Sequence, residues 1–147
     1  MKEDVVKILD SRRIMAISTV RPDGWPQTTI VGYANAGFAI YFVVSRASQK
    51  FANIAHDNRV SIAVGEEPRD LSQLKAVFAG AIAEEVTGLA EAEQAWRLLK
   101  ARHPNLAWLE IPEQSETALM RAACMHVSML DYTQGLGHTE AISVSGQ

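Results

Sequence analysis

The stretch IMAISTVRPDGWPQTTIVGYANAGFAIYFVV, residues 14–44, decides the fold of this chain. β-Branched and apolar residues dominate it, as is typical of strands. Two polar segments that contain glycine interrupt it, Arg21-Pro22-Asp23-Gly24 and Asn35-Ala36-Gly37. Pro followed by Asp-Gly, and Asn close to Gly, favour tight turns. The pattern therefore predicts an antiparallel meander of three strands. Their ranges are residues 14–20, 26–33 and 38–44.

The remaining sequence predicts helices around this meander and three further strands. The spacing of apolar residues, the capping residues and the prolines indicate helices at 2–12, 48–56, 87–102 and 112–123. The further strands are expected at 60–64, at 74–86 with a bend or bulge at Gly80, and at 125–132. No repeat or linker divides the chain. We expect a single domain over residues 1–147, an α+β fold built on a small six-stranded barrel.

Composition narrows the function classes. The 147 residues carry a net charge of -3, so neither nucleic acid nor an anionic membrane surface is an expected partner. No apolar run approaches the roughly 20 residues that a membrane span needs, and the N-terminus lacks the apolar core of a signal peptide. One cysteine excludes an internal disulfide and favours a reducing compartment. We therefore expect a cytoplasmic protein.

The segment Ser45-Arg46-Ala47-Ser48-Gln49-Lys50 carries the most chemical information, because a predicted strand runs there into a predicted helix. The start of a helix has unpaired N–H groups and partial positive charge, so cations at this end are mildly unfavourable. A bound phosphate would pair with the N–H groups and offset the positive charge. It would accept hydrogen bonds from the backbone, the Ser48 hydroxyl and the Lys50 ammonium. The alternative is that Ser48 only caps the helix and that water solvates both cations.

Four segments, in this order and spacing, resemble the FMN-binding split-barrel family whose best-known member is pyridoxamine 5′-phosphate oxidase. They are Asp23-Gly24-Trp25-Pro26-Gln27, Ile40-Tyr41-Phe42-Val43-Val44, Ser48-Gln49-Lys50 and Asn58-Arg59-Val60-Ser61-Ile62-Ala63-Val64. The resemblance implies a six-stranded antiparallel split β-barrel with flanking helices. It also implies a two-fold homodimer that holds flavin mononucleotide (FMN) between its subunits, in keeping with the usual symmetry of small oligomers.

The resemblance carries nine positions into the cofactor site, on the second and third strands, the turn that follows and the fifth strand. They are Thr29, Ile30, Val31, Val43, Val44, Ser48, Gln49, Lys50 and Lys75. The second strand would line one side of the flavin ring, and the third would lie beneath the ring or the ribityl chain. The turn would hold the phosphate, and the lysine of the fifth strand would reach the flavin of the partner subunit. Gln49 stands where the family often has Arg, a loss for which Arg46 would have to compensate.

Departures from the family enzyme argue against pyridoxamine phosphate as the substrate. Thr29 and Ala34 occupy places where that enzyme has cationic residues, and no Arg follows Arg121 to form its substrate-binding C-terminal segment. We expect an FMN-dependent oxidoreductase that acts on another small molecule, with no general acid or base identified. A deazaflavin-dependent reductase and a flavin- or haem-binding module without turnover are the alternatives, because a fold alone does not decide function.

Other candidate residues have simpler interpretations. The four histidines lack metal-ligand spacing, so no metal site is predicted, and His138, in a glycine-flanked loop, is the one that could reach a substrate. Trp25 would either stack near a ring or pack within its turn. Cys124 has no neighbouring base in the sequence and is expected to be an inert, buried thiol.

Overall fold

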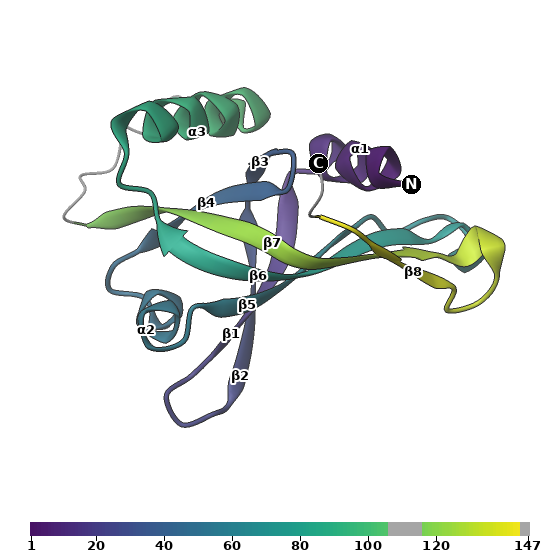
Figure 1. Cartoon of the computed structure of the whole chain (residues 1–147), viewed down its shortest axis with the longest axis horizontal. Coiled ribbons are helices and arrows are strands. Elements are labelled where there is room, and N and C mark those ends of the chain that lie inside the picture. The colour runs from purple at the N-terminus through teal and green to yellow at the C-terminus, as the bar shows by residue number, and fades with distance from the viewer. Residues whose placement is uncertain (106–115, 145–147) are drawn as a thin grey trace.

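One antiparallel sheet and three α-helices make up the part of the chain that the structure, a computed structural model, describes: residues 1–105 and 116–144 (Figure 1). The helices are α1 (Lys2–Ser11), α2 (Gln49–His56) and α3 (Leu89–Arg102), with short 3-10 turns η1 (Leu71–Gln73) and η3 (Tyr132–Gln134). The strands are β1 (Ile14–Val20), β2 (Pro26–Gly32), β3 (Ala34–Ala36), β4 (Ala39–Ser45), β5 (Arg59–Gly65), β6 (Lys75–Glu85), β7 (Thr117–Asp131) and β8 (Thr139–Ile142).

The strand order is β2-β1-β5-β6-β7-β4-β3, and β8 pairs with the second half of β7. The outermost strands of this order, β2 and β3, are consecutive in the chain, separated by Tyr33 alone. The backbone N–H of Tyr33 still bonds to Arg13 O beside β1, whereas Ala34 already pairs with Tyr41 of β4. The chain thus crosses from one edge of the sheet to the other at Tyr33, which curls the sheet into a split barrel.

Local sequence explains where the strands turn. Gly24 and Gly37 lie in the turns of the β1–β2 and β3–β4 hairpins. Their φ values are 87° and 59°, a backbone region that glycine enters without steric cost. A register shift in the β6–β7 pairing falls between Gly80 and Ala81. This bulge confirms the predicted irregularity at Gly80.

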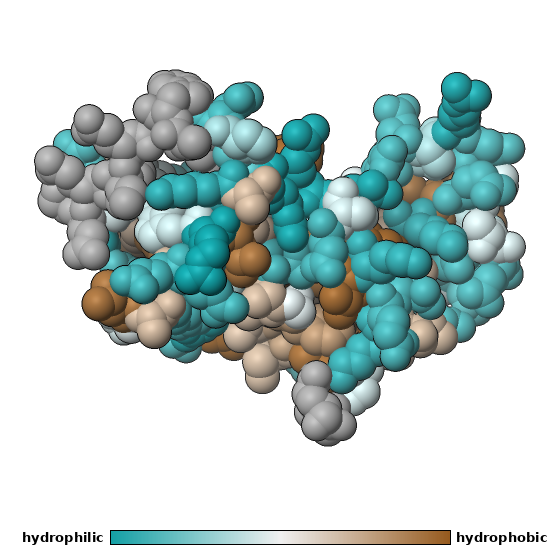
Figure 2. Space-filling model, turned by 90° about the horizontal axis from the view of Figure 1, so that it is seen from above, coloured by the Kyte–Doolittle hydropathy of each residue, from teal (hydrophilic) through white to brown (hydrophobic). Residues whose placement is uncertain are grey.

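The inner face of the sheet and α1 form the main core. Its largest fully buried side chains include Leu9, Met15, Ile17, Tyr33 and Phe42. A second cluster, with Leu99 and Ala95 of α3, packs α3 against β3 and β4. Figure 2 looks down on the side that carries α1 and α3, where hydrophilic side chains cover the outer surfaces and apolar residues show between them.

The α+β split-barrel prediction is confirmed, with eight strands in place of six. Two helices, α1 and α2, and three strands, β1, β5 and β6, lie within a residue or two of their predicted positions. The helix expected from Thr87 begins one residue later, with Gly88 as its N-cap. The predicted turn at residues 35–37 begins too early, because Asn35 and Ala36 still belong to β3.

Two predictions of local structure are wrong. The three-strand meander does not form, because β4 pairs with β7 and β3 and makes no sheet pairing with β2. The helix predicted at 112–123 lies partly outside the described residues, and from Thr117 onward the chain is strand β7. The sixth predicted strand, 125–132, is therefore only the second half of a strand of 15 residues.

Candidate functional site

The first turn of α2 follows directly from the end of β4. Ser48 is the N-cap: its Oγ accepts the Phe51 N–H at 3.1 Å and donates its own proton to Ser45 O at 2.6 Å. The backbone N–H groups of Gln49 and Lys50 make no hydrogen bond to any described residue. Two donors at the positive end of a helix are therefore open to an acceptor. The single proton of the Ser48 hydroxyl, in contrast, is already used.

Lys50 adds a full positive charge to this turn. Its side chain is half-buried, and it forms no ion pair with any carboxylate in the described part of the chain. Desolvation by burial lowers the pKa of its ammonium group. A partly desolvated charge without a counter-ion is unfavourable by itself. Lys50 and the open N–H groups together make this turn suitable for an anion.

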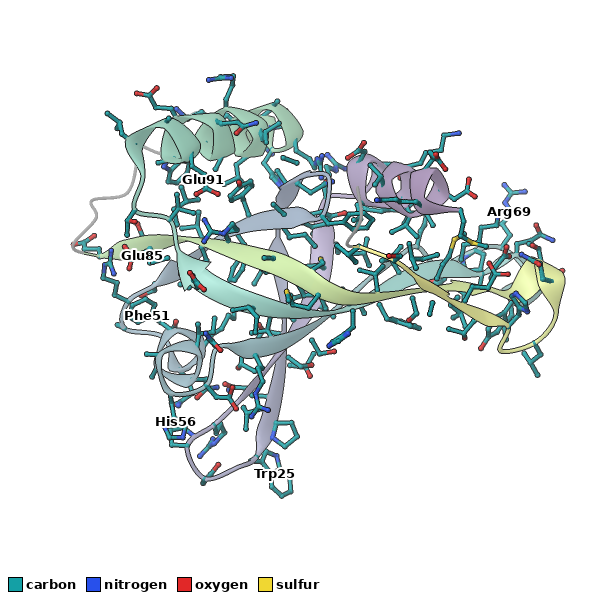
Figure 3. The ribbon with its side chains drawn as sticks, in the orientation of Figure 1. Trp25, Phe51, His56, Arg69, Glu85 and Glu91 are labelled. Carbon is teal, nitrogen blue, oxygen red and sulfur yellow. The ribbon has the colours of Figure 1, made fainter. Side chains whose placement is uncertain are left out.

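Arg46 does not offer its guanidinium in the same way. Its two terminal nitrogens donate to the two carboxylate oxygens of Glu85 at 2.8 and 2.7 Å, and the group lies 5.5 Å from the centre of the Phe51 ring. Figure 3 shows Glu85 and Phe51 on the same side of the molecule as α2. Hydrogen bonds from Arg46 lower the pKa of Glu85. To contact a phosphate, Arg46 would have to exchange this bidentate carboxylate partner.

The candidate residues of β2 divide between the two faces of the sheet. Thr29 and Val31 are partly buried on the inner side, whereas Ile30 is 65% exposed on the outer side. The Thr29 hydroxyl oxygen is buried and has no hydrogen-bond partner among the described residues. A buried polar atom without a partner costs free energy. A ligand lying along β2 would have a hydroxyl to bind there.

A buried polar network joins α2 to the β1–β2 hairpin. Asn53 donates to Thr19 Oγ1 and to Gln27 Oε1, both at 3.0 Å, and accepts from Gln49 Nε2 at 2.8 Å. No sequence pattern assigned a role in the site to Asn53, Thr19 or Gln27, although Gln27 belongs to one of the four motifs. A signal for Asn53 existed, since an asparagine inside a helix of eight residues opposes helix propensity and needs a partner to offset that cost.

The candidate residues of β4 and β6 lie apart from one another. Val44 is buried in the main core and Val43 packs against the cluster beneath α3, so side-chain contact from Val44 to a ligand is blocked. Lys75 begins β6, which ends at Glu85 beside Arg46. At about 3.3 Å per residue, the two ends of this strand are roughly 33 Å apart. Within one chain, Lys75 therefore does not join the turn at Lys50.

The other singled-out residues occupy three separate places. Trp25 is 72% exposed at the tip of the β1–β2 hairpin, where it projects away from the barrel (Figure 3). His138 lies in the loop before β8, and its Nε2 is 3.1 Å from Oε1 of Glu140 in that strand. Burial raises the pKa of the Cys124 thiol to about 11, as expected for an inert cysteine.

The described residues, 1–105 and 116–144, contain neither a metal-ligand cluster nor a membrane-spanning helix. In these ranges, no cluster of three or more His, Cys, Asp or Glu side chains is placed to hold a metal ion. Among the helices described, none combines the length and apolar character needed to cross a bilayer.

Comparison with known families fits this geometry. The family model of pyridoxamine 5′-phosphate oxidase matches residues 1–131, most of the chain. The chain belongs to this family. No curated protein matches the sequence. Family membership agrees with the order of motifs around the turn at Lys50 and with the split barrel.

Solved structures share the fold at low sequence identity. A heme-binding protein from Mycobacterium smegmatis is 22% identical, with a TM-score of 0.83 over 97% of this chain. This chain spans only 57% of that protein's length. An FAD-binding protein from Mesorhizobium loti is 22% identical, with a TM-score of 0.69 over 86% of this chain and 91% of its own. General stress protein 26 from Bacillus anthracis is 18% identical, with a TM-score of 0.71 over 96% and 98%.

Proposed function

We propose that this member of the pyridoxamine 5′-phosphate oxidase family binds FMN, with the phosphate at the first turn of α2. The observation that carries the proposal is the half-buried Lys50, which lacks a described ion pair, next to the open N–H groups of Gln49 and Lys50. A phosphate dianion would neutralise the ammonium group and accept from both N–H groups. The unpartnered hydroxyl of Thr29 supports placement of the rest of the ligand along β2.

We also propose a two-fold homodimer with the cofactor between the subunits. The register places Ile30, Ala16, Ala63, Phe78 and Ser128 in one row across the outer face of five strands. Ile30 is 65% and Phe78 39% exposed, and Ala16 and Ala63 lie between them, so this part of the row is apolar. Such a face suits burial against a second copy. A partner subunit would also bring Lys75 to a site that it does not reach within its own chain.

The proposed activity is oxidation or reduction of a small molecule other than pyridoxamine phosphate. The bound flavin supplies the redox chemistry, and the protein supplies binding, orientation and electrostatics. In this chain Lys50 and the α2 N–H groups would hold the phosphate end, and Thr29 would accept or donate a hydrogen bond along the ligand. Thr29 is neutral where the family enzyme is cationic, which supports a substrate without a phosphate group at that position.

The first test is the identity of the ligand that copurifies with the protein, read by absorption spectrum and by mass spectrometry of the denatured protein. FMN supports the proposal, and bleaching by NADH or NADPH followed by reoxidation in air would support turnover. Lys50→Ala is expected to weaken FMN binding by about 1.5–3 kcal/mol, the contribution of a charge-assisted hydrogen bond. Riboflavin, which lacks the phosphate, should bind both proteins alike.

Lys100→Ala is the matched control, because Lys100 is exposed on α3 and forms no described ion pair. This variant should bind FMN as the wild type does. Equal FMN affinity in Lys50→Ala and Lys100→Ala would remove the phosphate site from α2.

A haem-binding module is the second candidate. His126 is exposed on the outer sheet face opposite Gly80, and its imidazole has no hydrogen-bond partner among the described residues, so a ring nitrogen is open to a metal. The same spectrum separates the two candidates, because haem and flavin absorb differently. A deazaflavin with a longer acidic tail fits the site less well, because Arg46 already donates to Glu85 and does not offer that tail a cation.

A further inference from the structure

The side chain of Asn53 is fully buried, with 0% of its residue surface exposed, in the middle of α2. Both of its amide protons are donated, to Thr19 Oγ1 and Gln27 Oε1, and its Oδ1 accepts from Gln49 Nε2. A buried amide whose groups are satisfied in this way holds its partners at fixed distances and angles. Asn53 therefore contributes directional hydrogen bonds, as well as packing, to the position of α2.

The three amides of the network are oriented together. With both protons of Asn53 donated to the β1–β2 hairpin, its oxygen faces Gln49, and Gln49 turns its own nitrogen inward. Reversing the Asn53 amide alone would bring its nitrogen against that of Gln49 and its oxygen against that of Gln27, so the three amides could reverse only as a set. The orientation of the Gln49 carboxamide is thereby coupled to those of Asn53 and Gln27.

The same amide joins the two parts of the proposed cofactor site. Thr19 and Gln27 are direct cross-strand partners in the β1–β2 pair, and Gln27 shares the inner side of β2 with Thr29, two residues further on. On α2, Gln49 lies one turn before Asn53 on the same side of the helix. Asn53 therefore links the strand proposed to follow the ligand to the turn proposed to hold its phosphate.

The helix cannot hold this position by itself. α2 has eight residues, and an isolated helix of that length is unstable in water. Its buried residues are Asn53 and Ile54. Apolar packing by Ile54 has no preferred direction, whereas the hydrogen bonds of Asn53 do. The rotation of α2 about its axis, and the position of its first turn relative to β2, therefore depend on the Asn53 amide.

We propose that Asn53 is a positioning residue that sets the spacing between β2 and the first turn of α2, so that the site selects a flavin with a terminal phosphate over the same ring without one. This inference rests on the proposed FMN function and extends it to the selectivity of that site. The Asn53 side chain acts through Gln27 and Gln49 and is not itself a contact of the ligand.

The test compares the dissociation constants of FMN and riboflavin for the full-length protein and its variants. Asn53→Ala should lower the preference for FMN over riboflavin about tenfold, the equivalent of one well-placed hydrogen bond. Gln27→Met removes the acceptor of one Asn53 bond from a partly exposed position, and should lower the preference in the same direction if Asn53→Ala does not fold. Asn58→Ala, which removes an exposed amide outside the network, should leave both constants unchanged.

The outcomes separate this inference from the function on which it rests. An unchanged FMN-to-riboflavin preference in Gln27→Met and in folded Asn53→Ala, with wild-type protein that binds FMN, overturns the positioning role alone. Wild-type protein that binds neither flavin overturns the proposed function and this inference with it.

Discussion

Cys124 lies on β7 within the main core, and burial raises the pKa of its thiol from 9.0 to about 11. The unfolded chain loses this proton at a lower pH than the native protein does. The contribution to stability is therefore complete below about pH 9 and is lost as the pH rises toward 11. We expect the free energy of unfolding to fall across this window by up to about 2–3 kcal/mol.

Urea unfolding measured at several pH values between 8 and 11 checks this prediction. Cys124→Ala is the comparison, because it should be less stable near pH 8 through lost packing and yet show a shallower decline as the pH rises. Burial also raises the pKa of Tyr33 and of Tyr41 to about 12, so some decline should persist in the variant. Identical slopes in the two proteins would show that the thiol does not titrate as proposed.

At the scale of single residues, the sequence predicts the chemistry of the α2 turn better than it predicts which distant residues contact that turn. Ser48 was expected either to cap the helix or to bind a phosphate, and its hydroxyl caps in this structure. The approach of Glu85 to Arg46 and of Thr19 to Asn53 joins positions 39 and 34 residues apart. Such pairs depend on the tertiary fold, and a local pattern does not contain them.

At the scale of elements, β7 shows why local propensity failed. Residues 117–123 are rich in Ala, Leu and Met, which favour helices, and Glu116 and the preceding Pro112 match a helix start. The strand instead pairs with β4 on one side and β6 on the other, and Ala118, Met120 and Ala122 are buried. Hydrogen bonding on both edges and this burial outweigh the propensity, which differs by less than about 1 kcal/mol per residue.

The helix α3 is attached to the sheet through Glu91 in its first turn. The Glu91 carboxylate accepts from Tyr41 Oη and from Arg121 Nη1, each at 2.7 Å, and these bonds lower its pKa. Glu91→Ala leaves both donors without this acceptor, so we expect the free energy of unfolding to fall by about 1–3 kcal/mol. Chemical denaturation of the wild type and the variant measures the difference.

Glu93→Ala provides the control on the same helix, because Glu93 is exposed and makes no described ion pair. The loss should be within about 0.5 kcal/mol, as for most surface substitutions. Equal losses in the two variants would mean that Glu91 does not anchor α3.

For the whole molecule, strand order is the feature that the sequence left open. Hairpins β1–β2 and β3–β4 have local turn signals, but the pairing of β1 with β5 and of β4 with β7 joins distant segments. The bend at Tyr33 has no distinctive turn residue beyond Gly32, so the sequence pattern predicts a continuous strand over residues 26–33. Only the closure of the sheet requires that strand to leave β1 and join β4.

The last prediction concerns the assembly. If the outer row of the sheet is the dimer interface, wild-type protein should have twice the 16.1 kDa mass of the chain in light scattering. Ala63→Arg places a charge in the centre of that row, between Ala16 and Phe78, and should produce monomers because a buried, unpaired charge costs several kcal/mol. Ala101→Arg, the same change at an exposed position of α3, should remain dimeric.

Cofactor binding by the monomer then decides whether the site is shared. Within one chain, Lys75 and the α2 turn lie at opposite ends of β6, so a monomer would present each half-site without the other. Ala63→Arg should therefore lose FMN together with the dimer, while Ala101→Arg keeps both. A monomeric Ala63→Arg that binds FMN as tightly as the wild type would confine the site to one chain, and a dimeric Ala63→Arg would place the interface on another face.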